Sequence, residues 1–331
     1  MNDMRGMICL DCGGALQPGG KDSGVICASC GKNYQVREGI PFIPGKKDLS
    51  GYDTGIAGEN ARIYDSLADL GTQVKGVNLL LSEYYTDRIR DIHIELLSPS
   101  LSPSAKVLEA GCGLGKISRA LTGITAGYHG FDISYASVKK ARDICMPGNS
   151  RFFVGNVLAI PFPEGYFDAV VSSEMLEHVP ADKAAIAEMK RVLKPKGLLS
   201  VSVPNSMMAF YPLEFFSMVR HYGLKKFRNL IRRELDWAAD EAYDRPYMPG
   251  QFRKLFTEEG LSIAAHRTAL CYLWRRPYSD VIEWLEKKKW FDPAGFVERY
   301  FRVDSFMTGN RLPVLGMMGT RQFILARKDR S

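Results

Sequence analysis

The chain has 331 residues, of which 46% are hydrophobic and 24% charged, and its formal net charge is +7. This composition is ordinary for a globular protein and leaves room for one large domain with additions. No apolar run approaches the roughly 20 residues of a membrane-spanning helix, and the start of the sequence lacks the pattern of a secretory signal, so we expect a soluble, cytoplasmic protein.

Four of the seven cysteines form two Cys-x2-Cys pairs, and each pair lies next to glycine: Cys9 with Cys12, and Cys27 with Cys30. Each tight turn aims two thiolates at one tetrahedral ion, so the spacing predicts a zinc ribbon. Two disulfides are the alternative, which a reducing compartment disfavours. Four thiolates leave no open coordination position, and the predicted zinc is therefore structural.

The segment YQVREGIPFIPG, residues 34–45, follows the cysteines. Together they resemble the small zinc-ribbon domain that serves as an activating subunit of tRNA and protein methyltransferases. We place a zinc-ribbon domain at 1–47 and a helical cap or linker at 48–104. The apolar periodicity predicts two helices between about 59 and 97. Tyr64 in the first of them is a candidate to close over a ligand, with packing on the surface as the alternative.

From residue 106 the sequence alternates between apolar strand patterns and helical patterns. The predicted strands are 106–110, 127–133, 151–156, 166–173 and 197–205, and the predicted helices are 116–124, 134–145 and 181–195. Such alternation indicates an α/β fold with a parallel sheet covered on both faces. In these sheets ligands bind at the carboxyl ends of the strands.

Three glycines, Gly111, Gly113 and Gly115, stand at the first strand-to-helix turn. They allow a tight turn whose amide groups meet a ligand with no side chain in the way. A dinucleotide fingerprint would require a sixth-position glycine, where this chain has Lys116, so pyrophosphate binding is disfavoured. Asp132 ends the second strand, where a carboxylate can accept both ribose hydroxyls of a nucleoside.

The segments VLEAGCGLG, FDIS, GNVLAIPFPEGYFD, EMLEHV and LKPKGLL, taken together and in this order, resemble the class I S-adenosylmethionine-dependent methyltransferases, in particular the branch of quinone-biosynthesis enzymes. The match covers about residues 106–205. It implies a Rossmann-like seven-stranded sheet with helices on both faces, a methyltransferase domain at 105–331, and S-adenosyl-L-methionine as cofactor.

The resemblance also implies roles for matching residues. Glu109 and the glycine loop would hold the methionine end of the cofactor, Asp132 the ribose, and Asn156 with Val157 the adenine edge. The family usually has Asp at position 156, and a neutral amide makes a weaker acceptor. The full set of candidate cofactor residues is Tyr64, Glu109, Gly111, Cys112, Gly113, Gly115, Asp132, Ile133, Asn156, Val157 and Ser173.

Glu174, Glu177 and His178 form the pattern E-x-x-E-H after the fourth strand and are the candidate catalytic residues. Two carboxylates and an imidazole can bind a divalent cation that polarises a hydroxyl. The triplet resembles the metal-binding motif of polyprenyl-dihydroxybenzoate O-methyltransferases and of small-RNA terminal 2'-O-methyltransferases. His178 as a metal-free base and a purely structural His178 are the alternatives. His221 and Asp244 are candidates for a fourth ligand.

Two insertions, at about 206–248 and 272–318, are predicted to form helices of a substrate lid. The first mixes aromatic and basic residues, which suits an acidic small molecule, a peripheral contact with a membrane surface, or an ordinary solvated helix face. The segment TRQFILARK is predicted to form a final strand, which the resemblance to the methyltransferases implies to be antiparallel.

The sequence best supports a methyltransferase that acts on a small or lipid-linked molecule, with an oxygen atom as the favoured acceptor. The alternative is an RNA methyltransferase with the zinc ribbon as its RNA-recognition module, which the positive charge favours. A non-catalytic binding module is disfavoured by the intact glycine loop. The sequence leaves the oligomeric state open.

Overall fold

The structure is a computed structural model. It describes residues 4–19, 24–45, 77–145, 150–206, 245–269 and 319–329, and the isolated positions 292, 295, 299 and 302. Within the described residues, no helix combines the length and apolarity that crossing a bilayer requires.

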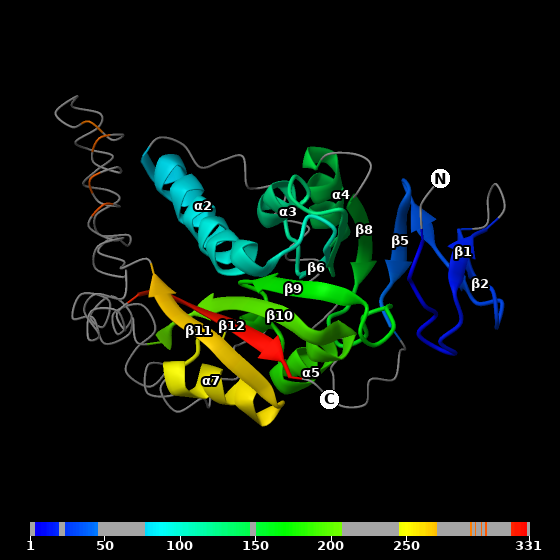
Figure 1. The fold of residues 1–331 in the computed structure, drawn as a ribbon. Coiled ribbons are helices and arrows are strands. Elements are labelled where there is room, and N and C mark those ends of the chain that lie inside the picture. The colour runs from blue at the N-terminus through cyan, green and yellow to red at the C-terminus, as the bar shows by residue number, and fades with distance from the viewer. Residues whose placement is uncertain are drawn as a thin grey trace, which may run out of the picture.

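A nine-stranded sheet forms the centre of the described structure, in the order β11-β12-β10-β9-β6-β7-β8-β5-β4 (Figure 1). The strands that follow residue 100 are β6 (Lys106–Ala110), β7 (Gly127–Asp132), β8 (Ser150–Gly155), β9 (Phe167–Ser173), β10 (Leu193–Pro204), β11 (Leu261–Ala269) and β12 (Arg321–Lys328). The first five of these run parallel, whereas β12 is antiparallel to both of its neighbours, β10 and β11. The predicted α/β class and the antiparallel last strand are confirmed.

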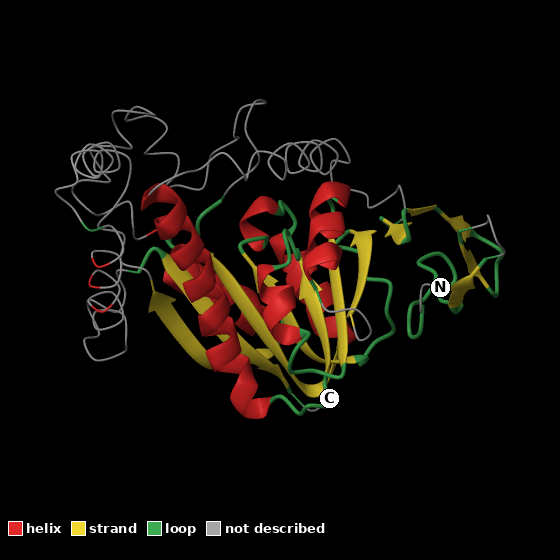
Figure 2. Cartoon of the chain, turned by 90° about the horizontal axis from the view of Figure 1, so that it is seen from above, coloured by secondary structure: helices red, strands yellow, loops and turns green. Residues whose placement is uncertain are grey.

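Helices cover both faces of this sheet (Figure 1), and Figure 2 looks onto one of these faces. On one face lie α2 (Val77–Leu97), which continues into the short helix η1 (Ser98–Ser100), α3 (Lys116–Leu121) and α4 (Tyr135–Ile144). The other face carries α5 (Asp182–Val192) and α7 (Pro249–Glu258). The short helix η2 (Leu176–His178) follows β9. The result is the three-layer arrangement that alternating strands and helices predict.

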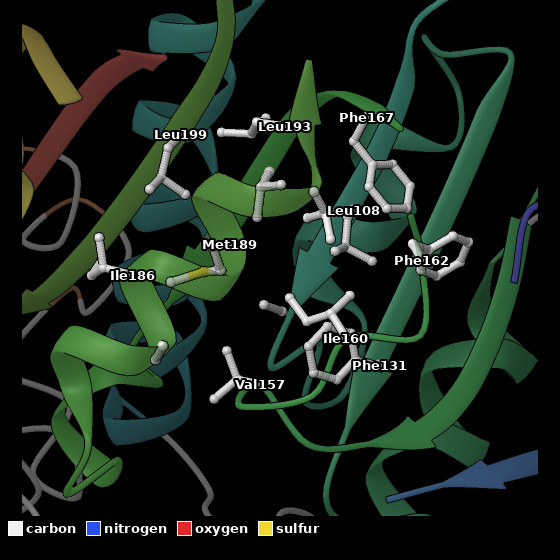
Figure 3. Close-up of a cluster of buried hydrophobic side chains, with 14 of the residues drawn as sticks. Leu108, Phe131, Val157, Ile160, Phe162, Phe167, Ile186, Met189, Leu193 and Leu199 are labelled. Carbon is white, nitrogen blue, oxygen red and sulfur yellow. The ribbon is translucent and has the colours of Figure 1, made fainter. Parts of the chain in front are cut away.

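Each face of the sheet buries its own apolar cluster, because successive side chains of a strand point to opposite faces. In β6, Val107 belongs to the cluster under α2, α3 and α4, whereas Leu108 belongs to the cluster under α5 and α7. Figure 3 shows the cluster under α5 and α7, which contains Ile186 and Met189 of α5 together with Leu108 and Phe131 of the strands. These buried layers fix where the strands end, and therefore where the loops of the site lie.

The zinc-ribbon segment contributes a separate three-stranded antiparallel sheet of β1 (Leu16–Pro18), β2 (Val25–Cys27) and β3 (Asn33–Tyr34). The hairpin of β4 (Val36–Arg37) and β5 (Ile40–Ile43) then joins the central sheet, with β5 parallel to β8. In the register, Phe42 lies opposite Val154 and Ile43 opposite Gly155. The seven-stranded sheet that the resemblance implies is therefore present as β6 to β12, and two strands from the ribbon segment extend it to nine.

Side chains fasten this added hairpin to α4. Glu38 forms an ion pair with Lys139 at 2.7 Å, and its backbone carbonyl accepts a hydrogen bond from Arg142 Nη1 at 2.6 Å. The ring of Phe42 stacks on that of Tyr135 with 5.5 Å between centroids. The ribbon segment thus contacts the sheet domain directly.

The predicted helix over 181–195 ends earlier, at Val192, and β10 begins at Leu193. Pro195 disfavours a helical conformation at the residue before it. The backbone then turns at Lys196, where φ is 64°, before regular pairing with β9 resumes at Leu198. The described helix α2 agrees with the second predicted helix. Residues 46–76 and most of both insertions lie outside the described residues, and the domain boundaries stay predictions.

Candidate cofactor and acceptor site

The glycine loop connects β6 to α3 with three positive φ angles: 77° at Gly111, 46° at Gly113 and 81° at Gly115. A Cβ on Gly111 would lie 2.5 Å from Met175 Cγ, and one on Gly115 would lie 2.7 Å from Ala141 Cα. A Cβ on Gly113 would meet nothing within 4 Å. Two glycines therefore permit close packing, whereas Gly113 borders open space that a ligand can enter.

Asp132 ends β7 beside this loop and accepts two backbone hydrogen bonds. Gly113 N donates to Oδ2 at 2.9 Å, and Ser134 N donates to Oδ1 at 3.0 Å. Ser134 in turn caps α4 by accepting a hydrogen bond from Ser137 N at 3.1 Å. The carboxylate thus fixes the loop at the carboxyl ends of β6 and β7, where ligands of such sheets bind.

Glu109 lies in β6 with only 2% of its surface exposed. Its Oε2 accepts hydrogen bonds from Ser118 Oγ, at 2.6 Å, and from the hydroxyl of Tyr128. Burial raises the pKa of Glu109 to about 7, although both hydrogen bonds favour the charged form. One carboxylate oxygen is therefore used inside the fold, and contact with the methionine end of a cofactor stays a prediction.

The remaining predicted cofactor residues lie along the same edge of the sheet. Cys112 is buried, and its backbone N–H donates to Phe131 O at 2.9 Å. Ile133 is half-buried and Val157 is buried. Asn156 follows β8, and its Oδ1 accepts a hydrogen bond from Leu158 N at 2.9 Å, which forms a local turn.

Ser173 and Glu174 stand at the carboxyl end of β9. Ser173 Oγ lies 3.2 Å from Ser202 Oγ, and Ser202 Oγ donates to Glu174 Oε1 at 3.1 Å. The other carboxylate oxygen of Glu174 forms an ion pair with Nε of Arg321. Both oxygens of Glu174 are therefore engaged by protein groups. Tyr64 lies outside the described residues.

Glu177 and His178 lie in η2, directly after this strand end. Glu177 is 2% exposed, and its Oε1 is 3.9 Å from Nε2 of His178, whose side chain is 23% exposed. That separation is too long for a hydrogen bond, so the two side chains are neighbours without a direct bond. His221 and Asp244 lie outside the described residues.

The four ribbon cysteines bring their Sγ atoms within 4.8 Å of one another. None is in a disulfide, and Sγ atoms accept backbone N–H groups: Gly14 N donates to Cys12 Sγ and Ser29 N to Cys27 Sγ, both at 3.4 Å. Four thiols with sulfur-directed amides fit a tetrahedral zinc ion. Among the described residues, this is the only group of three or more metal-ligating side chains whose donor atoms gather this closely.

Sequence reasoning missed three members of the site: Arg321, Tyr85 and the Tyr128 hydroxyl. The guanidinium carbon of Arg321 lies 5.2 Å from the ring centroid of Tyr85 in α2. The sequence did contain a signal for Arg321. In a sheet whose last strand is antiparallel, the first residue of that strand lies beside the carboxyl ends of the parallel strands, where the ligand site is expected. Tyr128 and Tyr85 carry no such signal, since their roles depend on which helix or loop packs over them.

Comparison with known proteins identifies the central segment. Residues 108–201 match the family model described as a methyltransferase domain. Over 107 residues the chain is 41% identical to a 2-methyl-6-phytyl-1,4-hydroquinone methyltransferase of Synechocystis sp.. The aligned segment covers 31% of this chain and 33% of that protein. Over 139 residues it is 34% identical to a ubiquinone biosynthesis O-methyltransferase of Xanthomonas campestris pv. campestris, and this aligned segment covers 39% of this chain and 58% of that protein.

The chain thus spans a third of the length of the first relative and somewhat over half of the second. Among solved structures, that of magnesium protoporphyrin IX methyltransferase from Synechocystis PCC 6803 matches with a TM-score of 0.52 at 17% identity. The match covers 84% of this chain and 100% of the other. At this identity the likeness concerns the fold, which is the Rossmann-like fold of class I methyltransferases.

Proposed function

Residues 108–201 of this chain are a methyltransferase domain of the S-adenosylmethionine-dependent class, and on this premise we propose that the protein methylates a hydroxyl of a small or lipid-linked acceptor. One relative is named as a hydroquinone methyltransferase, and the other is named as an O-methyltransferase of ubiquinone biosynthesis. Both names support a small-molecule acceptor for the present chain.

The observation that carries the proposal is the pairing of Gly113 with Asp132 beside open space. The amide of Gly113 is held by one oxygen of Asp132, yet nothing lies within 4 Å of where its Cβ would be. A nucleoside ligand fits here because the carboxylate can accept ribose hydroxyls while the bare backbone borders the ligand. In the proposal, Asp132 holds the ribose, the glycine loop lines the methionine end, and Asn156 with Val157 lines the adenine.

The proposed chemistry asks the protein to orient the acceptor, exclude water and take up one proton. When bound, S-adenosylmethionine supplies an already activated methyl group. The new O–CH3 bond would form as the S–CH3 bond of the sulfonium breaks and a neutral thioether leaves, while the proton of the acceptor hydroxyl would pass to the imidazole of His178. The buried carboxylate of Glu177, 3.9 Å away, stabilises the imidazolium that results.

The zinc ribbon has a structural role in this proposal. A zinc ion on Cys9, Cys12, Cys27 and Cys30 would hold the small sheet that leads into β5, and β5 pairs with β8 directly before Asn156. The ribbon therefore supports the strand that ends at the adenine side of the site. Peripheral membrane contact through the two insertions and a cytoplasmic location stay predictions.

Cofactor binding tests the site first, by titration calorimetry with S-adenosylmethionine. Asp132→Ala is expected to lower the affinity at least about tenfold, since charged hydrogen bonds are lost. Asp168→Ala is the matched control, because Asp168 also accepts two hydrogen bonds, from Lys106 N at 2.9 Å and Lys194 Nζ at 2.7 Å, but at the amino ends of strands of the same sheet. Equal affinities in both variants would contradict the assignment of Asp132.

Methyl transfer tests the acceptor class. The full chain is incubated with labelled S-adenosylmethionine and with small-molecule, lipid and RNA fractions of a cell extract. Label in the small-molecule or lipid fraction supports the proposal, and His178→Ala is expected to abolish it while cofactor binding persists. Label confined to RNA would replace the proposal with the RNA alternative and make the ribbon a recognition module.

A further inference from the structure

Arg321 is the first residue of β12, and the topology places it at the acceptor side of the sheet. It lies opposite Pro204 at the end of β10 and opposite Ala269 at the end of β11. Because β12 runs antiparallel to β10, its beginning meets the edge where the parallel strands end. The glycine loop and Asp132 lie at the same edge.

The carboxylate of Glu174 is held by Arg321 at one oxygen and by Ser202 at the other. Nε of Arg321 pairs with Glu174 Oε2, and Ser202 Oγ donates to Oε1 at 3.1 Å. The side chains of Arg321 and Glu174 are 18% and 24% exposed, so water screens the ion pair only partly. Burial opposes the charge of Arg321, but electrostatic attraction to Glu174, together with smaller contributions from Tyr85 and Glu177, raises its pKa, and the guanidinium stays charged.

Glu174 is also constrained in its backbone. Its φ is 50°, an unusual value for a residue with a side chain, and its N–H donates to Ser202 O at 3.1 Å. The next residue, Met175, packs against Gly111 of the cofactor loop. The ion pair therefore anchors the segment that leads from β9 past the glycine loop to His178.

The E-x-x-E-H pattern suggests a divalent cation on Glu174, Glu177 and His178, but the residues present do not fit one. A divalent cation needs the carboxylate oxygens as ligands. Those of Glu174 are taken by a guanidinium and a hydroxyl. A cation would have to displace Arg321 and would meet its positive charge.

We propose that Arg321 takes the place of a divalent cation on Glu174, as a positioning residue that keeps the 174–178 segment in its working arrangement without such a metal. This inference rests on the proposed function and deepens it. Methyl transfer to a hydroxyl then proceeds with the proton passing to His178, and it needs no divalent cation apart from the zinc of the ribbon.

Binding of Mn2+ to the full, zinc-loaded chain tests the proposal without an acceptor, by electron paramagnetic resonance. The wild type is expected to bind Mn2+ only at a background level. Arg327→Gln is the matched control, because it removes an exposed arginine from the same strand, and it is expected to show the same background. Arg321→Gln is expected to bind Mn2+ at least about tenfold more tightly than Arg327→Gln does, because it frees a carboxylate. Adding Glu174→Gln to that variant should remove the gain, and Arg321→Lys should behave as the wild type.

Wild-type binding of Mn2+ that Glu174→Gln abolishes would overturn the proposal, and so would a folded Arg321→Gln that gains no Mn2+. If Arg321→Gln does not fold, the comparison of Mn2+ binding between the wild type and Glu174→Gln still tests the proposal. Once an acceptor fraction is known, Arg321→Gln should lose transfer far more than S-adenosylmethionine affinity, with partial rescue by Arg321→Lys. Unchanged cofactor affinity in Asp132→Ala would instead refute the proposed function and leave the Mn2+ result standing.

Discussion

Glu109 gives the chain a pH-dependent stability whose sign and size follow from its burial. The carboxyl has a usual pKa of 4.5 and a pKa of about 7 in the fold, chiefly because burial penalises its charged form. Between these values the folded state binds a proton that the unfolded state has released, so stability falls as the pH rises. The contribution is fully present below about pH 4.5 and is lost as the pH passes through about 7.

The magnitude follows from the two pKa values. A difference of one in pKa corresponds to about 1.4 kcal/mol, so the full loss is about 3 kcal/mol, and most of it falls between pH 5 and pH 8. Glu109→Gln keeps an oxygen that accepts from Ser118 and Tyr128 but has no charge to bury. Relative to the wild type, the variant is expected to gain about 2 to 3 kcal/mol in stability between pH 5 and pH 8.

The assay is denaturant unfolding of both proteins at pH 5 and pH 8, followed by far-ultraviolet circular dichroism. Taking the difference between the two proteins cancels every other group that titrates in this range. Glu95→Gln, which removes an exposed carboxylate from α2, is the control. A difference between wild type and Glu109→Gln that changes by less than about 0.5 kcal/mol from pH 5 to pH 8 would refute the reasoning.

Three further changes test other parts of the site. Cys27→Ser is expected to lower the zinc content of the purified chain by elemental analysis, and full retention of zinc would count against the ribbon site. Gly115→Ala puts a Cβ 2.7 Å from Ala141 Cα at a φ of 81°, so it is expected to lower the melting temperature clearly. Gly113→Ala has room for its Cβ and should cost only about 1 to 2 kcal/mol for its backbone conformation, but it should weaken S-adenosylmethionine binding in calorimetry. If Gly113→Ala were less stable than Gly115→Ala, the assignment of Gly115 to close packing and of Gly113 to the ligand side would be contradicted.

Local patterns predicted much of the fold because the interactions behind them are local. The alternation of apolar strands with amphipathic helices predicted β6 to β10, and the three glycines marked the ligand side of the sheet. The Cys-x2-Cys spacing predicted the thiol cluster, since each turn brings its own two sulfurs together.

Contacts between distant segments were beyond the reach of these patterns. Glu174 and Arg321 are far apart in the sequence, and only the packing of β12 against β10 brings them together. The pairing of β5 with β8 has the same cause, because an apolar stretch such as IPFI carries no information on which remote strand it joins. Asn156 shows a third case, in which a side chain expected to face a ligand also closes its own turn with Leu158.

The pairing of β5 with β8 also has a consequence for association between chains. Without the ribbon segment, β8 would be the outermost strand on its side of the sheet, with a row of backbone N–H and C=O groups open to any other strand. Its sequence, SRFFVG, contains Phe152 and Phe153 and a single charge at Arg151, a composition that favours intermolecular β-pairing. The ribbon hairpin replaces this edge with the two-residue strand β4. Zinc bound to the cysteines would then act as a safeguard against aggregation, and stripping it should make the protein self-associate along β8.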